Sequence, residues 1–314
     1  MEADRPDEAD VPPDGHVDRR DDQAAGGRTA RPAGTEAETR SRQECYDELR
    51  VAEAKEKSEA AQRTTAEEQA ATDKWNEDAT ESRGMWTEYL RKWPPNERAS
   101  SDTSDDPSGS RHGDGNRVLD RAASSQVEAA CDRIAERERD KITPAMHTVE
   151  SQDPDRHLVG LDDRLKDRDR IKDKVSGMMK ELSFSAEEAI EHVPDAIRYT
   201  FEYRDTYYTQ GVWSDMGCLK EQGFELHKLW NAWSDDQYRG INSQWIDTDT
   251  GQRFEVQFHT HISYEAKQLT HDAYERLRTH QADVFEELVL EAFQRKVSAD
   301  VPVPNGATDV PDHP

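Results

Sequence analysis

The chain has 314 residues, of which 33% are hydrophobic and 35% are charged, and its formal net charge is −26. This acidic balance argues against broad affinity for nucleic acids, which usually requires a basic surface. No apolar run approaches the roughly 18 to 20 residues that would span a bilayer, so we expect no membrane contact. The N-terminal residues lack the hydrophobic segment of a secretory signal peptide. We therefore expect a cytoplasmic protein, or export by a route that needs no cleavable signal.

The cysteines are Cys45, Cys131 and Cys218, which are widely spaced and form no CxxC pair. This odd number and this spacing argue against a disulfide framework and against a structural zinc site. We expect Cys131 and Cys218 to be small core residues.

The N-terminal third is divided by its composition. Residues 1–40 contain almost no aliphatic side chains and many Asp, Arg, Pro and Gly, which predicts a disordered acidic tail. Residues 41–96 are rich in Ala, Glu, Lys, Gln and Arg and carry a thin apolar stripe, which predicts a helical arm. A helical hairpin, a coiled-coil-like arm for oligomerisation or docking, and a lone frayed helix all fit this pattern. Residues 97–116 have the composition of a flexible linker.

Nearly all strand-forming and periodic segments fall in residues 117–298, which we interpret as one α+β domain with helices against a mixed sheet. Residues 299–314 are expected to be a disordered tail. The ranges predicted to be helical are about 120–150, 167–182, 185–192, 205–222 and 261–297, and those predicted to be strands are 159–165, 196–203, 224–233, 241–247 and 253–259.

A basic cluster lies in RLKDRDRIKDKV, residues 164–175. Arg164 and Lys166 stand two apart, so on an extended chain they point the same way. Asp167 can cap a following helix, in which Arg170 and Lys174 lie one turn apart on a single face. A row of cations of this kind can clamp a polyphosphate. Because aspartates interleave with the bases, a salt-bridged, solvated helix face is the alternative.

A second informative stretch is YRGINSQWIDTDTGQRFEVQFH, residues 238–259, which predicts a β-hairpin. In its second strand three apolar residues alternate with polar ones, so that one face is apolar and the other polar. The polar face carries Arg253, Glu255, Gln257 and His259. A half-solvated edge strand would show the same alternation.

Together these segments resemble the synthetase domain of the RelA/SpoT family, the nucleotide pyrophosphokinases that make alarmones. Arg164, Lys166 and Lys174 fall on the spacing of the family's R-x-K element and its later lysine. VPDAIRYTF, with Asp195 and Arg198, is similar to its aspartate and arginine strand. Tyr238-Arg-Gly-Ile-Asn242 is similar to its G-Y-x-S-L-H element, and Glu255-Val-Gln-Phe-His-Thr260 resembles its E-V-Q-I-R-T strand. The resemblance covers roughly residues 125–295, and it implies a nucleotidyltransferase-like mixed sheet.

The chain departs from the family pattern at three positions. Asp195 stands three residues before Arg198 instead of the usual five, with Val193 at the expected place. Asn242 replaces the histidine of the tyrosine element, and His259 replaces the arginine after the glutamate strand. In these respects the domain resembles those at the C-termini of actinobacterial polymorphic toxins. Such a setting implies an immunity protein or antitoxin, or a second copy of the chain, as a partner of the helical arm.

The resemblance implies transfer of the β,γ-pyrophosphate of ATP to the 3′-hydroxyl of a guanine or adenine nucleotide, with Mg²⁺ as cofactor. Glu255 would serve as catalytic base or metal ligand, and Asp195 as the other metal ligand. The expected acceptor pocket consists of Tyr238, Asn242, Gln257 and His259, and the expected ATP phosphate ligands are Arg164, Lys166 and Lys174 with help from Arg170 or Lys172.

Each residue of the acceptor pocket also has a simpler interpretation. Tyr238 could be an ordinary turn aromatic, Gln257 could satisfy backbone groups, and His259 could lie on the surface. Lys267, His271 and Tyr274 share a helical face after the glutamate strand and could reach the site, although packing roles are the commoner outcome for such residues.

Two other functions fit the same residues. The first is pyrophosphorylation of the 3′ CCA end of tRNA, which presents the same hydroxyl group. The second is a catalytically silent module that binds nucleotides. The enzyme interpretation requires the cations near position 170 and the carboxylate at position 255 to converge on one cleft.

Overall fold

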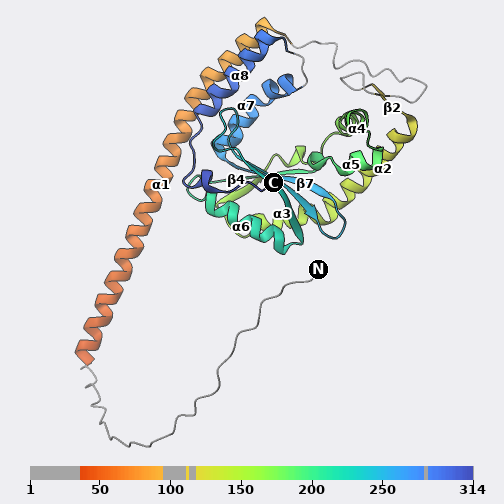
Figure 1. Ribbon diagram of the computed structural model, residues 1–314. Coiled ribbons are helices and arrows are strands. Elements are labelled where there is room, and N and C mark those ends of the chain that lie inside the picture. Colours follow the sequence, from red (N-terminus) through yellow and green to blue (C-terminus); the bar gives the residue numbers. More distant parts are fainter. Residues whose placement is uncertain (1–35, 95–110, 113–117, 279–281, 314) are drawn as a thin grey trace, which may run out of the picture. The chain divides into compact units, whose positions relative to one another are not determined.

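The computed structural model describes residues 36–94, 111–112, 118–278 and 282–313. The predicted tail at 1–40 and linker at 97–116 fall almost entirely outside the described residues. The described residues divide into one unit that ends at Glu59 and a second that runs from Ala60 onward. Helix α1 (Glu36–Lys92) is one continuous helix and not a hairpin (Figure 1), and its last 33 residues belong to the second unit. No helix among the described residues is long and apolar enough to cross a membrane.

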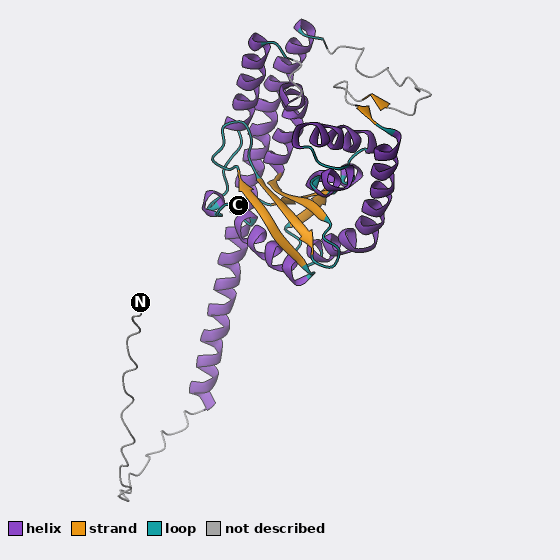
Figure 2. Cartoon of the chain, turned by 45° about the vertical axis from the view of Figure 1, so that its right-hand side comes forward, coloured by secondary structure: helices purple, strands orange, loops and turns teal. Residues whose placement is uncertain are grey.

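The second unit is built on a mixed five-stranded sheet, as predicted (Figure 2). Its strand order is β3-β4-β7-β6-β5, and only the central β4–β7 pair is parallel. The predicted hairpin is confirmed, because β6 and β7 pair antiparallel through the turn that ends at Gly251. The strands are β3 (Arg156–Val159), β4 (Arg198–Tyr203), β5 (Phe224–Asn231), β6 (Ile241–Asp247) and β7 (Arg253–Thr260), and a separate two-stranded sheet joins β1 (Arg111–His112) to β2 (Val118–Leu119).

The apolar face of the sheet forms the main core. Tyr199, Phe201 and Tyr203 of β4 lie beside Val256 and Phe258 of β7, and all five are buried. Helix α6 (Tyr208–Glu221) covers this face, since the Tyr208 hydroxyl donates to the Phe258 carbonyl. Helices α2 (Arg121–Arg137) and α3 (Thr143–Glu150) belong to the same core and are joined by a π-helical turn, Glu138–Ile142.

The opposite face is polar at its centre and is bordered by α4 (Arg168–Leu182) and α7 (His261–Arg278). The short helix α5 (Ala186–Glu191) follows α4, and a 3₁₀ turn at Pro194–Ala196 leads into β4. Helix α8 (Val284–Ala299) packs beside α7 and the last turns of α1, where the ring of Trp86 stacks on Phe293 with centroids 5.3 Å apart. This contact makes the end of α1 part of the folded unit.

Local signals predicted most boundaries correctly. The Asp167 carboxylate caps α4 as predicted, and a capping box of Ser185 and Glu188 begins α5 within the range predicted to be helical. The helical stretch predicted at about 120–150 consists of α2, the π-helical turn and α3 in succession. In α3 Pro144 occupies the first turn, where its missing N–H costs little.

Two other predictions about this unit differ from the structure. The strand expected at 159–165 instead ends at Val159 and is followed by a 3₁₀ turn, Leu161–Asp163, because Gly160 adopts a left-handed conformation with φ of 65°. The tail at 299–314 is not disordered over its described residues. Val301 and Val310 of this tail are buried, and His313 pairs with Leu229 of β5. The valines anchor the tail, but they are isolated in the sequence and form no periodic pattern from which the order could be predicted.

Candidate active site

The strand register brings the polar residues of the glutamate strand into two rows across the sheet. In the first row Glu255 of β7 stands between Arg198 of β4 and Gln244 of β6. In the second row Gln257 stands between Thr200 and Asn242, and Trp230 of β5 follows Asn242. Neighbouring strands are about 4.8 Å apart, so these side chains share one patch on the polar face.

Asp195 gathers the cations that the sequence places near position 170. Its Oδ2 atom lies 2.9 Å from Nζ of Lys166, 2.6 Å from Nζ of Lys174 and 3.4 Å from Nη2 of Arg198. Burial alone would raise the pKa of Asp195, but the charges of Lys174 and Lys166 outweigh that effect and hold the pKa well below its usual value. Asp195 is therefore an ionised, buried carboxylate that contacts three cations.

Arg198 joins this cluster to the glutamate strand. Its Nε atom lies 3.0 Å from Oε1 of Glu255, and the Gln257 amide donates to the same oxygen at 2.6 Å. The basic helix and the carboxylate at 255, some 80 residues apart in the chain, thus meet through Asp195 and Arg198. This is the convergence that the enzyme interpretation requires.

A cavity of about 520 Å³ opens above these residues. Lys166 and Lys174 stand behind Asp195 and do not line the cavity themselves, whereas Asp195 and Arg198 do. The cavity is lined by residues from the 3₁₀ turn before β4, from β4, β5, β6, β7, α7 and α8, and from the loop before β6, namely Asp195, Arg198, Trp230, Asp235, Asp236, Gln237, Tyr238, Asn242, Glu255, Gln257, Lys267, Thr270, His271, Tyr274, Glu275 and Gln294.

Tyr238 forms an aromatic platform in this cavity. Its ring stacks on Trp230 with centroids 5.8 Å apart and an interplanar angle of 14°. Its hydroxyl lies 3.0 Å from Oδ1 of Asn242 and 2.8 Å from Nε2 of His259. Burial and then the charge of Glu255 raise the pKa of Tyr238, so the phenol stays protonated. The ring is thereby fixed in orientation from two sides.

His259 lies beneath this platform and is fully buried. Its Nδ1 atom hydrogen bonds with the Ser263 hydroxyl at 2.9 Å, and burial lowers its pKa well below the usual value. The expected contact between His259 and the acceptor nucleotide is therefore wrong. Alternation does place His259 on the same face as Glu255, but α7 begins directly after the strand and covers this end of the sheet. Its role is to support Tyr238.

Two of the expected phosphate ligands also point elsewhere. The Arg164 guanidinium donates to Glu138 at 2.7 Å and to the Leu161 carbonyl at 2.8 Å. Arg164 has helical dihedral angles, so the extended-chain argument that paired it with Lys166 fails. Lys172 is buried against α2, where its Nζ contacts Glu128. It stands two residues from both Arg170 and Lys174 and therefore faces the other side of α4.

The remaining predicted residues come together. Arg170 is exposed on α4, and its charge acts on Glu275, which lines the cavity. Lys267, His271 and Tyr274 also line the cavity. Their common helical face after the glutamate strand had allowed this position without deciding between it and a packing role. Sequence reasoning missed Trp230. Only the β5–β6 register, which sets it beside Asn242, could have indicated it.

The donor set fits a magnesium ion. Asp195 Oδ1 is buried and has no hydrogen-bond partner, although Oδ2 of the same carboxylate has three cationic neighbours. Glu255, joined to Asp195 through Arg198, supplies a second carboxylate. Within the described ranges there is no group of three or more metal-binding side chains. Magnesium is suited to such a sparse site, because it typically takes one or two carboxylates together with phosphate oxygens and water.

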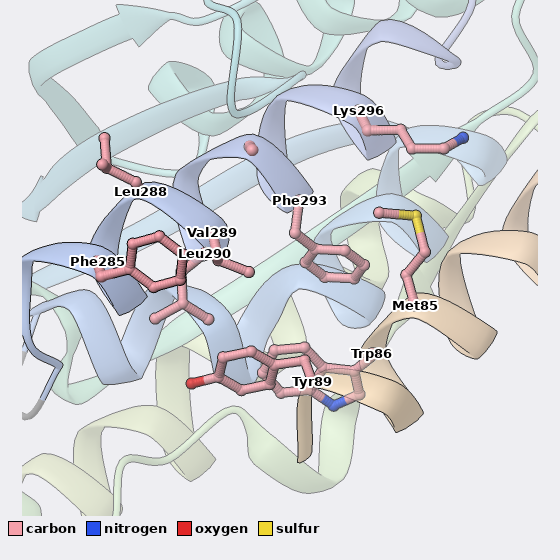
Figure 3. Close-up of a pocket in the computed structure, with 10 residues that line it drawn as sticks. Met85, Trp86, Tyr89, Phe285, Leu288, Val289, Leu290, Phe293 and Lys296 are labelled. Carbon is pink, nitrogen blue, oxygen red and sulfur yellow. The ribbon is translucent and has the colours of Figure 1, made fainter. Parts of the chain in front are cut away.

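A second hollow lies between α1 and α8 (Figure 3). Its walls are mainly apolar, with Trp86 and Tyr89 on one side and Phe285 and Phe293 on the other. Lys296 at its edge is engaged with Glu81 and Asp300. This hollow lacks the paired carboxylates and cations of the larger cavity and is not a candidate catalytic centre.

Comparison with known proteins gives partial likenesses. No family model and no curated protein matches the chain. Among solved structures, it is similar to the small alarmone synthetase 1 from Bacillus subtilis bound to its product pppGpp, with 16% identity, a TM-score of 0.37 and coverage of 56% of this chain and 91% of that one. Another structure of that synthetase shows 15% identity, a TM-score of 0.35 and coverage of 57% and 87%. The protein smu.1046c from Streptococcus mutans UA159 shows 13% identity, a TM-score of 0.34 and coverage of 56% and 87%.

Proposed function

We propose that this chain is an ATP-dependent pyrophosphokinase that transfers the β,γ-pyrophosphate of ATP to the 3′-hydroxyl of a guanine or adenine nucleotide. The observation that carries the proposal is the junction of the cation cluster with the glutamate strand, Lys166 and Lys174 to Asp195 to Arg198 to Glu255. The four family-like sequence elements supply these residues and the ring of Tyr238 beside them.

The proposed reaction is an in-line displacement at the β-phosphorus of ATP. The 3′-oxygen of the acceptor forms a bond to that phosphorus, the bond from the β-phosphorus to the oxygen shared with the α-phosphate breaks, and AMP leaves. Glu255 accepts the proton of the 3′-hydroxyl. Arg198 and Gln257 both occupy its Oε1 atom, which leaves Oε2 for the hydroxyl. Phosphoryl transfer depends mainly on positioning and charge neutralisation, and this site supplies both.

Asp195 forms ion pairs with the cations of the cluster. A bound polyphosphate would compete with this carboxylate for Lys166, Lys174 and Arg198, and Arg170 would reach it from the exposed face of α4. Asp195 would hold Mg²⁺ through its unpartnered Oδ1, and the metal when bound would neutralise charge on the phosphate oxygens while Glu255 serves as the base. The residues of the chain orient the reactants around that charge.

The acceptor base would stack on the free face of Tyr238, with Asn242 and Gln257 at its edge. Stacking on an aromatic ring accepts any base, so this platform selects for a nucleotide rather than for one base. The carboxylates of Asp235 and Asp236 line the same side of the cavity. A polyanionic RNA would have to pass them, and this favours a mononucleotide acceptor over the 3′ end of tRNA.

The test is transfer of label from ATP labelled in the γ-phosphate to GDP, GTP, ADP, ATP or tRNA, each offered separately with Mg²⁺. We expect a pyrophosphorylated mononucleotide with the wild type and loss of at least about 100-fold with Glu255→Gln, which keeps the shape but cannot accept the proton. Glu221→Gln, an exposed position at the end of α6, removes the same charge and should keep full activity.

Other outcomes identify the alternatives. Transfer to tRNA alone would reassign the acceptor. Binding of an ATP analogue without transfer to any acceptor would show a silent nucleotide-binding module. We further propose that the enzyme acts as a toxin through depletion of nucleotides, so induced expression of the wild type should arrest bacterial growth while Glu255→Gln should not.

A further inference from the structure

Lys267 is a cation of the cavity that has no ion pair with any residue in the described ranges. Its Nζ atom donates to Oε1 of Gln257 at 2.5 Å, and this amide is neutral. Burial and then the charge of Arg198 lower the pKa of Lys267 to about 8. The other cations at the site, Lys166, Lys174 and Arg198, each contact a carboxylate. A half-buried cation whose hydrogen-bond partner is a neutral amide calls for a reason beyond packing, and its ammonium group otherwise lies over the ring of Tyr264, 5.4 Å from the centroid.

The contact fixes which way the Gln257 amide points. A glutamine amide has an oxygen that only accepts and a nitrogen that only donates. With the ammonium group of Lys267 at the oxygen, the nitrogen must face the other way, and there it donates to Oε1 of Glu255 at 2.6 Å. If the amide turned over, its oxygen would face the carboxylate and its nitrogen would face the ammonium group, and both contacts would be repulsive.

We propose that Lys267 is a positioning residue that acts on the catalytic carboxylate through Gln257. The inference rests on the proposed function, since it assigns Glu255 the role of base. Lys267 holds the amide, the amide and Arg198 together hold Oε1, and Oε2 is thereby directed at the acceptor hydroxyl. Gln257 is buried and lies between Thr200 and Asn242 in the sheet. The Thr200 hydroxyl also donates to its amide oxygen, at 3.4 Å, so Lys267 supplies the shorter of the two contacts that turn the nitrogen toward Glu255.

The fold itself does not depend on this lysine. Helix α7 is anchored by Ile262, Ala266 and Ala273, which are buried in the core. Lys267 bears the cost of desolvating a charge without an ion pair to offset it, so an apolar side chain of similar length should not lower stability. A purely structural lysine would behave in the opposite way, because its removal would lower the melting temperature.

The experiment compares Lys267→Met with Lys220→Met, which makes the same substitution at an exposed position of α6. For Lys267→Met we expect kcat to fall by about 10- to 100-fold, KM for both substrates to change by less than about threefold, and Tm not to fall. Lys220→Met should match the wild type. In the Gln257→Met background, Lys267→Met should cause no further loss, because its effect passes through the amide.

Lys267→Arg keeps a cation at the amide oxygen and should retain most of the wild-type kcat, which gives a second variant if Lys267→Met does not fold. Unchanged kcat in Lys267→Met, or losses that multiply in the double variant, would overturn the proposal. The NMR signal of the Gln257 side-chain NH₂ group provides a readout that is independent of activity. It should shift in Lys267→Met and not in Lys220→Met, and an unmoved signal would overturn the inference even if the chain had no pyrophosphokinase activity.

Discussion

Asp195 has the least expected environment of the site residues, since one of its oxygens faces three cations while the other has no hydrogen-bond partner. Removing its charge in Asp195→Asn would leave Lys166, Lys174 and Arg198 to repel one another. Breaking a buried ion pair typically costs about 3 to 5 kcal/mol, and we expect a loss of stability of that order. Chemical denaturation at low ionic strength measures it.

The cause of that loss can be tested with anions. Sulfate or tripolyphosphate should restore much of the stability of Asp195→Asn, because either anion can neutralise the three cations in place of the carboxylate. Asp162→Asn, an exposed position two residues before Arg164, should show neither the loss nor the rescue. A loss in Asp195→Asn that persists at high anion concentration would instead point to a hydrogen-bonding or packing role for the aspartate.

Gly240 determines how closely the tyrosine element approaches the glutamate strand. Its φ is 148°, which side chains rarely tolerate, and a Cβ atom there would lie 2.6 Å from the His259 ring. Gly240→Ala should therefore displace His259, loosen Tyr238 and raise KM for the acceptor more than KM for ATP. We expect a stability loss of about 1 to 3 kcal/mol.

The double variant Gly240→Ala with His259→Ala distinguishes a steric clash with the His259 ring from backbone strain at Gly240. If the contact with the ring dominates, the second substitution should return part of the lost stability, although it removes the support of Tyr238 and should leave the acceptor KM high. Stability measurements on the two single variants and the double variant provide the cycle. Strictly additive losses would show that backbone strain at Gly240 is the cause.

At the scale of elements, the sequence predicted what depends on local signals. The cap at Asp167 and the alternation of β7 gave the boundaries of α4 and of the glutamate strand. The failures arose where tertiary packing decides. Lys172 belongs to the same charge run as Lys174, yet only the position of α2 shows that it pairs with Glu128. Likewise, alternation indicates the face of His259 but not the helix that covers it.

We expect the stability to depend on pH because of Asp205, which lies in the turn between β4 and α6. Burial, and to a lesser extent the nearby carboxylate of Glu68 on α1, raise the pKa of Asp205 to about 6 against the opposing effect of His261 on α7. The folded protein thus binds this proton more tightly than the unfolded chain does. The ionised carboxylate is penalised at and above pH 6, and the penalty disappears as the pH falls toward 4.

Asp205→Asn should therefore be more stable than the wild type at pH 7.5, by on the order of 2 kcal/mol, and the difference should vanish near pH 4. Denaturation of both proteins across that range measures the difference directly, which removes the contribution of all other carboxylates. A constant difference at every pH would show that the substitution acts through packing and not through the charge of Asp205.

For the whole molecule, the net charge of −26 gives no sign of the local cluster of cations at the site, where Lys166 and Lys174 contact Asp195 and Arg198 contacts Glu255. A phosphate ligand responds to the charges around the site and not to the net charge of the chain. The same contrast applies to α1. Its composition suggested an arm separate from the domain, yet Trp75, Ala79 and Tyr89 are buried in the core of the second unit. The tyrosine hydroxyl contacts Glu286 of α8, which also pairs with Arg276 of α7.

Two truncations test where the folded unit begins. A chain that starts at Ala60 retains every described contact of the second unit, so its melting temperature and its activity should equal those of the full chain. A chain that starts at residue 95 loses Trp75, Trp86 and Tyr89, and truncation of even one buried aromatic side chain typically costs about 3 to 5 kcal/mol. We expect this shorter chain to be largely unfolded or to aggregate through the exposed face of α8. If it instead folded with an unchanged melting temperature, the last turns of α1 would be an accessory arm after all.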